Sequence, residues 1–249
     1  MADAAIAEGL ELAHGHHLVL EAATFSLPGA AVTALIGPNG AGKTTLLHAL
    51  AGLLPPRAGR LDVPASATRG SVAYVLQGTQ VSSHLPLSVR ETVTMGRYAS
   101  AGAVRRLRAA DRDAVDRAIE ALGLGDIARR PLHQLSGGQR QRAFVAQGLA
   151  QEAQLLLLDE PLTGLDLVSR KHILDAIDAE RAAGHAVVVS THDLGDASEA
   201  DHLLLLAGRV VASGVPAEVL TDDNLVEAYG GHLLRLGDRT LILDDHAHH

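Results

Sequence analysis

The most constraining feature of this sequence is a short aliphatic run that ends in a glycine-rich turn. Residues Val32–Ile36 are typical of a buried β-strand, and the sequence GPNGAGKT follows at 37–44. The stretch from Lys43 to Ala51 is typical of a helix. A strand, a G-x-x-x-x-G-K-[ST] loop and a helix in this order form the context in which backbone amides cradle phosphates. The pattern therefore predicts a nucleotide-binding loop rather than a plain glycine turn with a solvated lysine.

Each residue type in this loop suits phosphate chemistry. The glycines let consecutive backbone amides point at one anion, and the following helix adds its positive end. Lys43 would neutralise the β- and γ-phosphates, and the hydroxyl of Thr44 would bind Mg²⁺. The candidate nucleotide-binding residues of this segment are Gly37, Pro38, Asn39, Gly40, Ala41, Gly42, Lys43, Thr44 and Thr45.

The rest of the chain alternates strand-like and helix-like segments, which predicts an α/β fold with a mostly parallel, buried sheet. Further short apolar runs bounded by polar or turn residues lie at 72–76, 155–158, 186–190 and 202–206. After them, short runs at 210–212, 233–236 and 240–243 predict a small β addition.

Residues 88–150 differ from the rest because they contain no clear strand. Ser88 and Glu91 form a capping box, and the segment 111–122 places its apolar residues on one helical face. We therefore expect a helical subdomain at 88–150, inserted into a core formed by residues 1–87 and 151–249.

Composition and charge exclude several kinds of site and partner. The 249 residues contain no cysteine and only 2% aromatic residues, which excludes a disulfide scaffold, a thiolate metal site and a surface of aromatics stacked on bases. The net charge of -8 opposes binding to a phosphate backbone. The apolar stretches are too short to span a bilayer, and the N-terminus has no secretory signal pattern. We expect an intracellular protein that does not bind nucleic acid.

Two further segments carry candidate chemistry. The run Leu155–Leu158 is followed by Asp159 and Glu160, so that one carboxylate can bind a metal while the next orients an attacking water. Apolar strands often end in acids, and this signal gains its weight from the phosphate loop. The sequence LSGGQ at 135–139 opens a helix through Leu149, and this second glycine-rich helix start can bind a second anion.

These motifs resemble those of the ATP-binding subunits of ABC transporters. In this resemblance, the Walker A loop is 37–44, the LSGGQ signature is 135–139 and the Walker B strand with its acid is 155–160. It covers nearly the whole chain, because the intervening markers occur in the expected order: Gln77 in the Q-loop, Asp166 in the D-loop and His192 as the switch histidine. The implied fold is a P-loop NTPase core with a mostly parallel sheet, an antiparallel β addition and a helical subdomain.

The resemblance implies an ATPase in which two copies of the chain, as a homodimer, sandwich two ATP molecules. The signature of one copy covers the nucleotide that the Walker A loop of the other copy holds. The implied catalytic residues are Glu160 as the base, with His192, Gln77 and Lys43. The implied Mg²⁺ ligands are Thr44, Gln77 and Asp159, and the further nucleotide contacts are Ser136, Gly137, Gly138, Gln139 and Asp166.

A further candidate contact concerns the base of the nucleotide. In the family an aromatic side chain upstream of Walker A stacks on adenine, and the matching segment here places His14 at that position. His14 either stacks there or forms a polar turn with His16 and His17.

A transporter ATPase without a spanning segment implies separate permease subunits in the membrane. The chain would then lie peripherally on the cytoplasmic face, and an extracytoplasmic solute-binding protein would complete the system. The apolar stretch 81–89 belongs either to the surface that receives the permease or to internal packing.

The segments 87–98 and 159–166 are similar to the zinc and manganese uptake branch of the family. The tail 244–249 either offers carboxylate and imidazole ligands to Zn²⁺ or Mn²⁺ or is simply a disordered end. The alternatives are an ABC subunit for an iron chelate, haem or another cargo, and a non-transport ABC ATPase of DNA repair or translation. A GTPase is excluded because the chain has no N-K-x-D motif.

Overall fold

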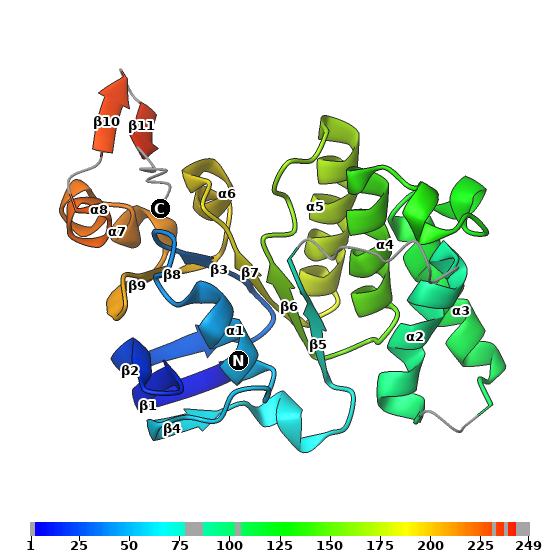
Figure 1. Cartoon of the computed structure of the whole chain (residues 1–249), viewed down its shortest axis with the longest axis horizontal. Coiled ribbons are helices and arrows are strands. Elements are labelled where there is room, and N and C mark those ends of the chain that lie inside the picture. Colours follow the sequence, from blue (N-terminus) through cyan, green and yellow to red (C-terminus); the bar gives the residue numbers. More distant parts are fainter. Residues whose placement is uncertain (1–2, 78–86, 103–105, 231–232, 237–238, 243–249) are drawn as a thin grey trace. The chain divides into compact units, whose positions relative to one another are not determined.

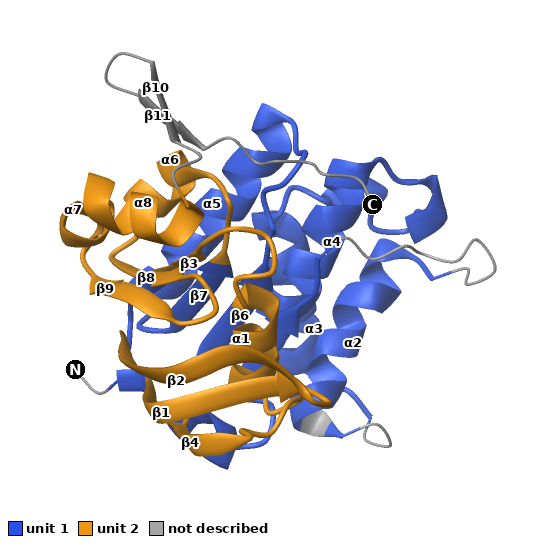
Figure 2. Cartoon of the chain, turned by 60° about the vertical axis from the view of Figure 1, so that its left-hand side comes forward, with its two compact units in different colours: residues 1–4, 28–32, 63–189 blue, residues 5–27, 33–62, 190–249 orange. Residues whose placement is uncertain are grey.

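A computed structural model describes residues 3–77, 87–102, 106–230, 233–236 and 239–242 (Figure 1). The chain forms two compact units, each assembled from segments that are distant in the sequence (Figure 2). Unit 1 comprises Met1–Ala4, Pro28–Val32 and Val63–Val189. Unit 2 comprises Ala5–Leu27, Thr33–Asp62 and Ser190–His249. Among the described residues no helix combines the length and the apolar character that crossing a bilayer requires.

The strands of unit 1 are β5 (Val72–Val75), β6 (Leu155–Asp159) and β7 (Ala186–Ser190), adjacent in this order. β5 and β6 are parallel, with Val72 opposite Leu155 and Val75 opposite Leu158. β6 and β7 are buried along their whole length, which is the pattern of a parallel sheet covered on both faces. The strands predicted at 155–158 and 186–190 are confirmed, and β5 ends one residue before the predicted end at 76.

Four longer helices pack on one another and on this sheet in unit 1: α2 (Val89–Ala101), α3 (Ala109–Ala121), α4 (Gly137–Leu149) and α5 (Leu167–Ala182). α2 begins at the predicted capping box, in which the Ser88 hydroxyl accepts from the backbone amide of Glu91 and the Glu91 carboxylate accepts from the amide of Ser88. The predicted apolar face of α3 is buried in the core of the unit. Short 3₁₀ turns lie at Pro64–Ala67, Gly125–Ile127 and Leu132–Gln134. The subdomain boundaries at 88 and 150 stay a prediction.

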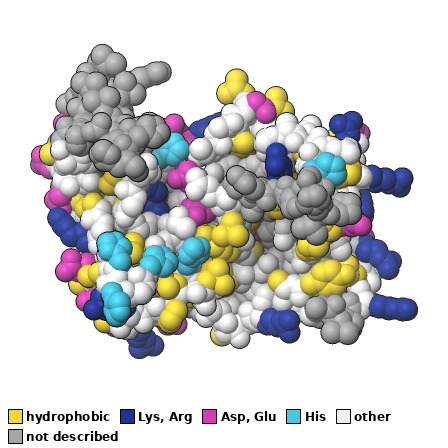
Figure 3. Space-filling model, viewed as in Figure 1, with side chains coloured by type: hydrophobic (Ala, Val, Ile, Leu, Met, Phe, Trp, Pro, Cys, Tyr) yellow, Lys and Arg dark blue, Asp and Glu magenta, His cyan; other side chains and the backbone are white. Residues whose placement is uncertain are grey.

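Basic side chains of unit 1 project from its helices. On the face shown in Figure 3, basic side chains gather along the edge where Figure 1 shows α2 and α3, whose basic residues are arginines. Two arginines of α2 and α3 have acidic partners: Arg97 lies 3.0 Å from Asp111 and 2.7 Å from Glu152, and Arg117 lies 2.8 Å from the same Glu152. Arg97 and Asp111 are each only 11% exposed, so this pair is shielded from solvent. These ion pairs tie α2, α3 and the segment after α4 together.

Unit 2 contains the strand and helix that flank the glycine-rich loop. β3 (Val32–Ile36) leads into the loop, and α1 (Lys43–Leu50) follows it, as predicted. β3 is parallel to β8 (His202–Leu206), and β8 is antiparallel to β9 (Val210–Gly214). The remaining described elements of this part of the chain are α6 (Leu194–Ser198), α7 (Pro216–Val219), α8 (Asp222–Tyr229), β10 (Leu233–Leu236) and β11 (Arg239–Ile242). β10 and β11 pair antiparallel, so the predicted β addition is confirmed in β9, β10 and β11.

Unit 2 also has a second sheet that sequence reasoning missed. It has the order β2-β1-β4, with β1 (Asp3–His14), β2 (His17–Pro28) and β4 (Ala58–Asp62). β1 buries small residues such as Ala5 and Ala7 before it buries Leu10, which makes its alternation weak as a hydrophobic signal. Gly59 of β4 lies so close to Gly9 that an ideal Cβ would be 2.1 Å from the carbonyl oxygen of Gly9.

Replacing Gly96 with alanine should destabilise unit 1, because an ideal Cβ there would lie 2.1 Å from the backbone oxygen of Gln147. α2 and α4 would have to separate, and we expect the free energy of unfolding to fall by about 2 kcal/mol, as in overpacked cores. Gly125→Ala is the matched control, since nothing lies within 4 Å of its Cβ, and it should change stability by less than ~0.5 kcal/mol. Chemical denaturation followed by circular dichroism measures both variants. Equal stability of the two variants would contradict the close packing of α2 on α4.

Candidate active site

The glycine-rich loop of unit 2 begins where β3 meets the end of β8. An ideal Cβ at Gly37 would lie 2.0 Å from the carbonyl oxygen of Leu206, so the backbones of the two strands are in direct contact there. Gly40 and Gly42 have φ values of 80° and 100°, in the left-handed region that favours glycine. The loop therefore needs all three glycines for backbone conformation, since Gly37 also has a positive φ of 154°, and it needs the first of them for space as well.

Lys43 begins α1, and its side chain folds back over the loop. Its Nζ donates to the carbonyl oxygens of Gly37 at 2.6 Å and Pro38 at 3.1 Å, and the residue is only 7% exposed. These carbonyl dipoles replace part of the water that a buried ammonium loses. The positive charge is thus held within the loop, beside the amides at the N-terminus of α1, which is an arrangement that attracts an anion.

The turn between β8 and β9 braces the loop from outside. The amide of Gly208 donates to the carbonyl of Ala41 at 3.2 Å, and the carbonyl of Gly208 accepts from the amide of Glu21 in β2 at 2.8 Å. An ideal Cβ at Gly42 would be 3.4 Å from the side chain of Val19, so β2 also packs against the loop. The phosphate loop is therefore supported by β2, which precedes it in the sequence, and by the turn after β8, which follows it by more than 150 residues.

The histidines at the turn between β1 and β2 also lie in unit 2. His14 ends β1, and its Nε2 lies 3.2 Å from the hydroxyl of Thr45 in α1, next to the loop. His16 lies in the two-residue turn and His17 begins β2, so the polar turn is present and His14 stands at its edge. The position of His14 is compatible with stacking on a base, which stays a prediction.

The position of His192 is set by the backbone hydrogen bond of the preceding residue, Thr191. The amide of Thr191 donates to the carbonyl of Leu35 at 3.0 Å, and the hydroxyl of Thr191 accepts from the amide of Asp193 at 3.1 Å. Leu35 belongs to β3, so the residue before His192 is bonded to the strand that leads into the phosphate loop.

The carboxylates predicted after β6 lie in unit 1, together with Gln77. The Gln77 amide nitrogen donates to Glu160 Oε2 at 2.7 Å, and the Thr163 hydroxyl donates to the same oxygen at 3.2 Å. Glu160 has a φ of 46°, which a residue other than glycine adopts only where its surroundings hold it. The structure therefore brings together two predicted residues, Gln77 and Glu160, and adds Thr163, which sequence reasoning missed.

Asp159 is buried beside Tyr74, a second residue that sequence reasoning missed. Asp159 is 3% exposed, and its Oδ2 accepts a hydrogen bond from the Tyr74 hydroxyl at 3.4 Å. Burial and the negative charge of Asp159 raise the pKa of Tyr74 well above its usual value, so Tyr74 keeps its proton and acts as a donor. The available signal was a tyrosine hydroxyl within an otherwise apolar strand, three residues before Gln77.

The predicted signature segment begins α4. Ser136 and Gln139 form a capping box: the Ser136 hydroxyl accepts from the Gln139 amide at 3.2 Å, and the Gln139 side-chain oxygen accepts from the Ser136 amide at 3.1 Å. Gly137 has open space around it, whereas Gly138 packs against the first turn of α5, where Asp166 is the N-cap residue. The signature and the predicted D-loop aspartate are thus in contact within unit 1.

The candidate residues therefore form two groups. Unit 2 carries the phosphate loop, His14, Thr45 and His192, and unit 1 carries Gln77, Asp159, Glu160, the signature segment and Asp166. Each group has a chemistry of its own. The loop amides and Lys43 can bind phosphate, and the carboxylates can hold a cation and accept a proton from water.

Replacing Gly37 with alanine should destabilise unit 2 more than replacing Gly40. At Gly40 nothing lies within 4 Å of an ideal Cβ, so Gly40→Ala costs only backbone strain, about 1–2 kcal/mol. Gly37→Ala adds a collision with the carbonyl of Leu206, which parts β3 from β8 and should cost about 3 kcal/mol or more. Urea unfolding of both variants measures the difference. A larger loss in Gly40→Ala would show that space at Gly37 is not limiting.

The sequence matches the ABC transporter family over residues 20–163. The zinc transport system ATP-binding protein TroB of Treponema pallidum is 37% identical over 249 residues, covering 97% of this chain and 94% of that protein. The manganese transport system ATP-binding protein MntA of Synechocystis is 39% identical, covering 86% of this chain and 85% of that protein. The chelated iron transport system membrane protein YfeB of Yersinia pestis is 36% identical, covering 93% of this chain and 80% of that protein.

A solved structure agrees with these relatives. A chain of a metal-chelate type ABC transporter in an inward-facing conformation superimposes with a TM-score of 0.79 at 31% identity, covering 92% of this chain and 90% of that chain. The P-loop NTPase fold implied by the motifs is therefore confirmed. The chain belongs to the ABC transporter family, as one of its ATP-hydrolysing, nucleotide-binding subunits.

Proposed function

We propose that this ATPase energises the uptake of a metal ion, zinc or manganese, across a membrane. The observation that carries the proposal is the set of relatives at 36–39% identity, named for zinc, manganese and chelated iron transport, which align over 86–97% of this chain. The segments 87–98 and 159–166 support it by their similarity to the same branch. The tail at 244–249, for which metal binding and a simple chain end were both left open, lies outside the described residues.

In this proposal the phosphate loop holds ATP. Lys43 now donates to two loop carbonyls, and it would exchange them for the β- and γ-phosphate oxygens, because a bond to a charged acceptor is stronger. The amides of the loop and the N-terminus of α1 would bind the same phosphates. The proposed nucleotide contacts of this loop are Gly37, Pro38, Asn39, Gly40, Ala41, Gly42, Lys43, Thr44 and Thr45, and His14 would stack on the base.

The proposed cation ligands fit Mg²⁺ by their chemistry. Thr44 offers a hydroxyl, Gln77 a carboxamide oxygen and Asp159 a carboxylate, and all three are the oxygen donors that Mg²⁺ prefers. Mg²⁺, when bound with ATP, would supply positive charge that stabilises the negative charge of the phosphates. Tyr74 already donates to Asp159, which keeps this buried carboxylate in one orientation.

Glu160 is the proposed general base for the attacking water. Gln77 and Thr163 both donate to its Oε2, and these bonds fix the plane of the carboxylate. His192 would contact the γ-phosphate. Hydrolysis would then depend on positioning and on charge stabilisation rather than on covalent catalysis.

A homodimer would complete each site. The chain has one phosphate loop and one LSGGQ segment, and in the proposed dimer the signature of each copy covers the γ-phosphate held by the other. Ser136, Gly137, Gly138 and Gln139 would supply this contact from the start of α4, and Asp166 would lie beside them. A head-to-tail pair of this kind closes on a twofold axis, which limits the assembly to two copies.

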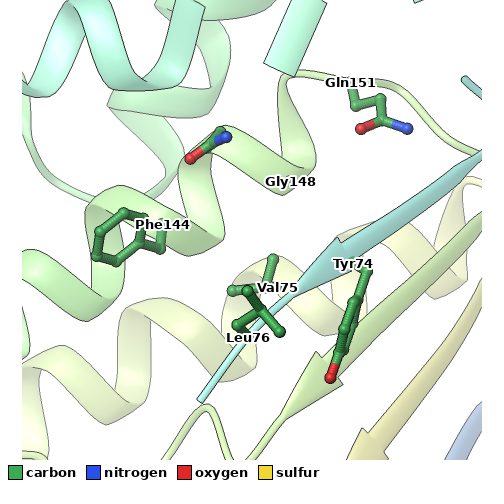
Figure 4. A pocket seen from close by; sticks show the side chains of 7 residues that line it. Tyr74, Val75, Leu76, Phe144, Gly148 and Gln151 are labelled. Carbon is green, nitrogen blue, oxygen red and sulfur yellow. The ribbon is translucent and has the colours of Figure 1, made fainter. Parts of the chain in front are cut away.

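The proposed permease contact lies beside Gln77, where β5 meets α4. A pocket of about 250 Å³ opens there within unit 1, with Val75 and Leu76 on one side and Phe144 on the other (Figure 4). Leu76 is 48% exposed, so the pocket offers apolar surface to a partner. Of the apolar stretch 81–89, expected either in this contact or in internal packing, the structure describes residues 87–89. The proposed assembly places the chain on the cytoplasmic face of the membrane, with a solute-binding protein on the opposite side.

A second cargo is favoured by a specific observation. YfeB, at 36% identity over 93% of this chain, is named for chelated iron. The cargo is bound by other subunits, so an iron chelate is compatible with the same ATPase chemistry.

Replacing Glu160 with glutamine should abolish ATP turnover while ATP binding persists, because the amide keeps the shape of the side chain but cannot accept the proton. The dimer should accumulate with ATP, since the nucleotide that holds it together is not consumed. Phosphate release and light scattering after size exclusion measure the two effects. Asp175→Asn, at an exposed carboxylate paired with Lys171, is the control and should keep wild-type turnover. Normal turnover in Glu160→Gln would remove this residue from the role.

Measuring metal uptake by cells tests which cargo the transporter carries. The chain offers a matched pair of variants for this test because it has only two lysines, Lys43 and Lys171. Cells that lack the gene are complemented with wild type, Lys43→Met or Lys171→Met, and the uptake of radioactive Zn²⁺, Mn²⁺ and chelated Fe³⁺ is measured. We expect wild type and Lys171→Met to restore Zn²⁺ or Mn²⁺ uptake, because Lys171 is exposed and pairs only locally with Asp175. Lys43→Met should not restore it. Restoration of iron uptake alone would favour the second cargo, and restoration by Lys43→Met would contradict the role of the loop.

A further inference from the structure

The signature helix and the D-loop meet at one buried serine. An ideal Cβ on Gly138, in the first turn of α4, would lie 2.6 Å from the hydroxyl oxygen of Ser169 and 3.1 Å from Oδ2 of Asp166. Ser169 is 2% exposed. Gly137, one residue earlier, would meet nothing within 4 Å. Of these two signature glycines, only Gly138 is thus required by contact with another segment of the same chain.

Ser169 also holds both carboxylate oxygens of Asp166. Its amide donates to Oδ1 at 2.8 Å, and its hydroxyl donates to Oδ2 at 3.0 Å. These two bonds lower the pKa of Asp166, and smaller contributions from the backbone amide of Val168 and then from the charge of Arg142 on α4 act in the same direction, so Asp166 stays ionised. The carboxylate is therefore fixed between α5, which it caps, and α4, which carries the signature.

Arg142 strengthens the same junction from the next turn of α4. Its Nη1 donates to the carbonyl of Leu122 at 2.8 Å, at the end of α3, and the residue is only 8% exposed. The orientation of α4 is thus set at Arg142 by α3 and at Gly138 by the first turn of α5.

We propose that Ser169 is a positioning residue of the ATPase: its buried hydroxyl locks Asp166 against Gly138, so that the D-loop carboxylate and the signature serine are presented together to the nucleotide of the partner copy. The proposal rests on the proposed function, which places Asp166 and Ser136 at that nucleotide. Ser169 itself touches no substrate. It acts through the position of α4 and of the D-loop.

A variant that loses only the hydroxyl of Ser169 distinguishes the positioning role of this residue from its part in capping α5. In Ser169→Ala the backbone amide still donates to Oδ1 of Asp166, so α5 keeps its N-cap. Oδ2 loses its donor, and the contact with Gly138 becomes looser. The variant should therefore fold, while Asp166 and the start of α4 become free to move independently.

The experiment compares Ser169→Ala with Ser66→Ala, which removes a hydroxyl that donates to the Val63 carbonyl in a distant 3₁₀ turn. Four quantities are measured: the melting temperature, the Kd for MgADP, the kcat for ATP, and the ATP-dependent dimer fraction in a Glu160→Gln background. ADP lacks the γ-phosphate that the signature would bind, so its Kd reports on the phosphate loop alone. We expect Ser169→Ala to keep the wild-type Kd for MgADP, to lose kcat by about tenfold and to dimerise weakly, as the loss of one hydrogen bond to a charged group implies. Ser66→Ala should match wild type in all four.

Ser169→Cys is the second variant if the alanine variant is unstable. A thiol is larger than the hydroxyl and donates only weakly, so the loss of kcat and of the dimer should persist in a Ser169→Cys protein whose melting temperature shows that it is folded. Wild-type kcat and dimer fraction in a folded Ser169→Ala or Ser169→Cys would overturn the proposal. If Lys43→Met and Glu160→Gln also hydrolyse ATP normally, the proposed function fails as well; if they are inactive, only the role of Ser169 fails.

Discussion

A strand that is covered on both faces has no place for a polar side chain that lacks a partner, and this constraint sets where the chemistry of the molecule can lie. In unit 1, β6 and β7 are buried throughout, and in unit 2, β3 and β8 are buried for nearly their whole length. Polar function therefore begins at the last residue of a strand, as at Asp159, or just beyond it, and a polar side chain within a strand, as at Tyr74, has a partner. Parallel neighbours then bring such residues together: Gln77 and Glu160 meet beyond β5 and β6, and Gly37 contacts Leu206 where β3 and β8 end.

Some glycines of this chain lie where another part of the chain comes very close, and others do not. This difference in the space around them cannot be seen in the sequence. Gly37 and Gly138 are each required because another part of the chain occupies the space of a Cβ. Gly40 has open space, and its positive φ is what a larger residue would strain. Within a single motif, one glycine can thus serve packing while its neighbour serves backbone conformation or a ligand.

Much of the fold could be predicted from the sequence because its strongest signals are local. The strand, glycine-rich loop and helix at residues 32–50 follow from composition and order alone, as do the buried runs that became β6 and β7. The sheet of β1, β2 and β4 was missed because small buried residues such as Ala5 and Ala7 give little hydrophobic contrast. The alternation of apolar and polar residues indicates a strand clearly only where the side chains that face the core are large.

The residues of the candidate site also differ in whether the sequence alone could identify them. Residues inside a motif, such as Lys43 and Glu160, could be proposed from the sequence, and their roles stay predictions. Thr163, Tyr74 and Ser169 could not, because each matters through a neighbour that only the fold supplies: Glu160, Asp159 and Gly138 with Asp166. Such supporting residues do not occur at a fixed distance from a motif in the sequence, because their contacts with the site residues depend on how the chain folds.

The bracing of the phosphate loop by the turn after β8 has a consequence for biosynthesis. The loop is complete in the chain once residue 44 has been made, but the carbonyl of Leu206 and the amide of Gly208, against which it folds, are added more than 150 residues later. A nascent chain on the ribosome therefore carries the whole glycine-rich motif without the surface that shapes it. The capacity to hold a nucleotide is acquired late in translation, when the C-terminal part of unit 2 has emerged.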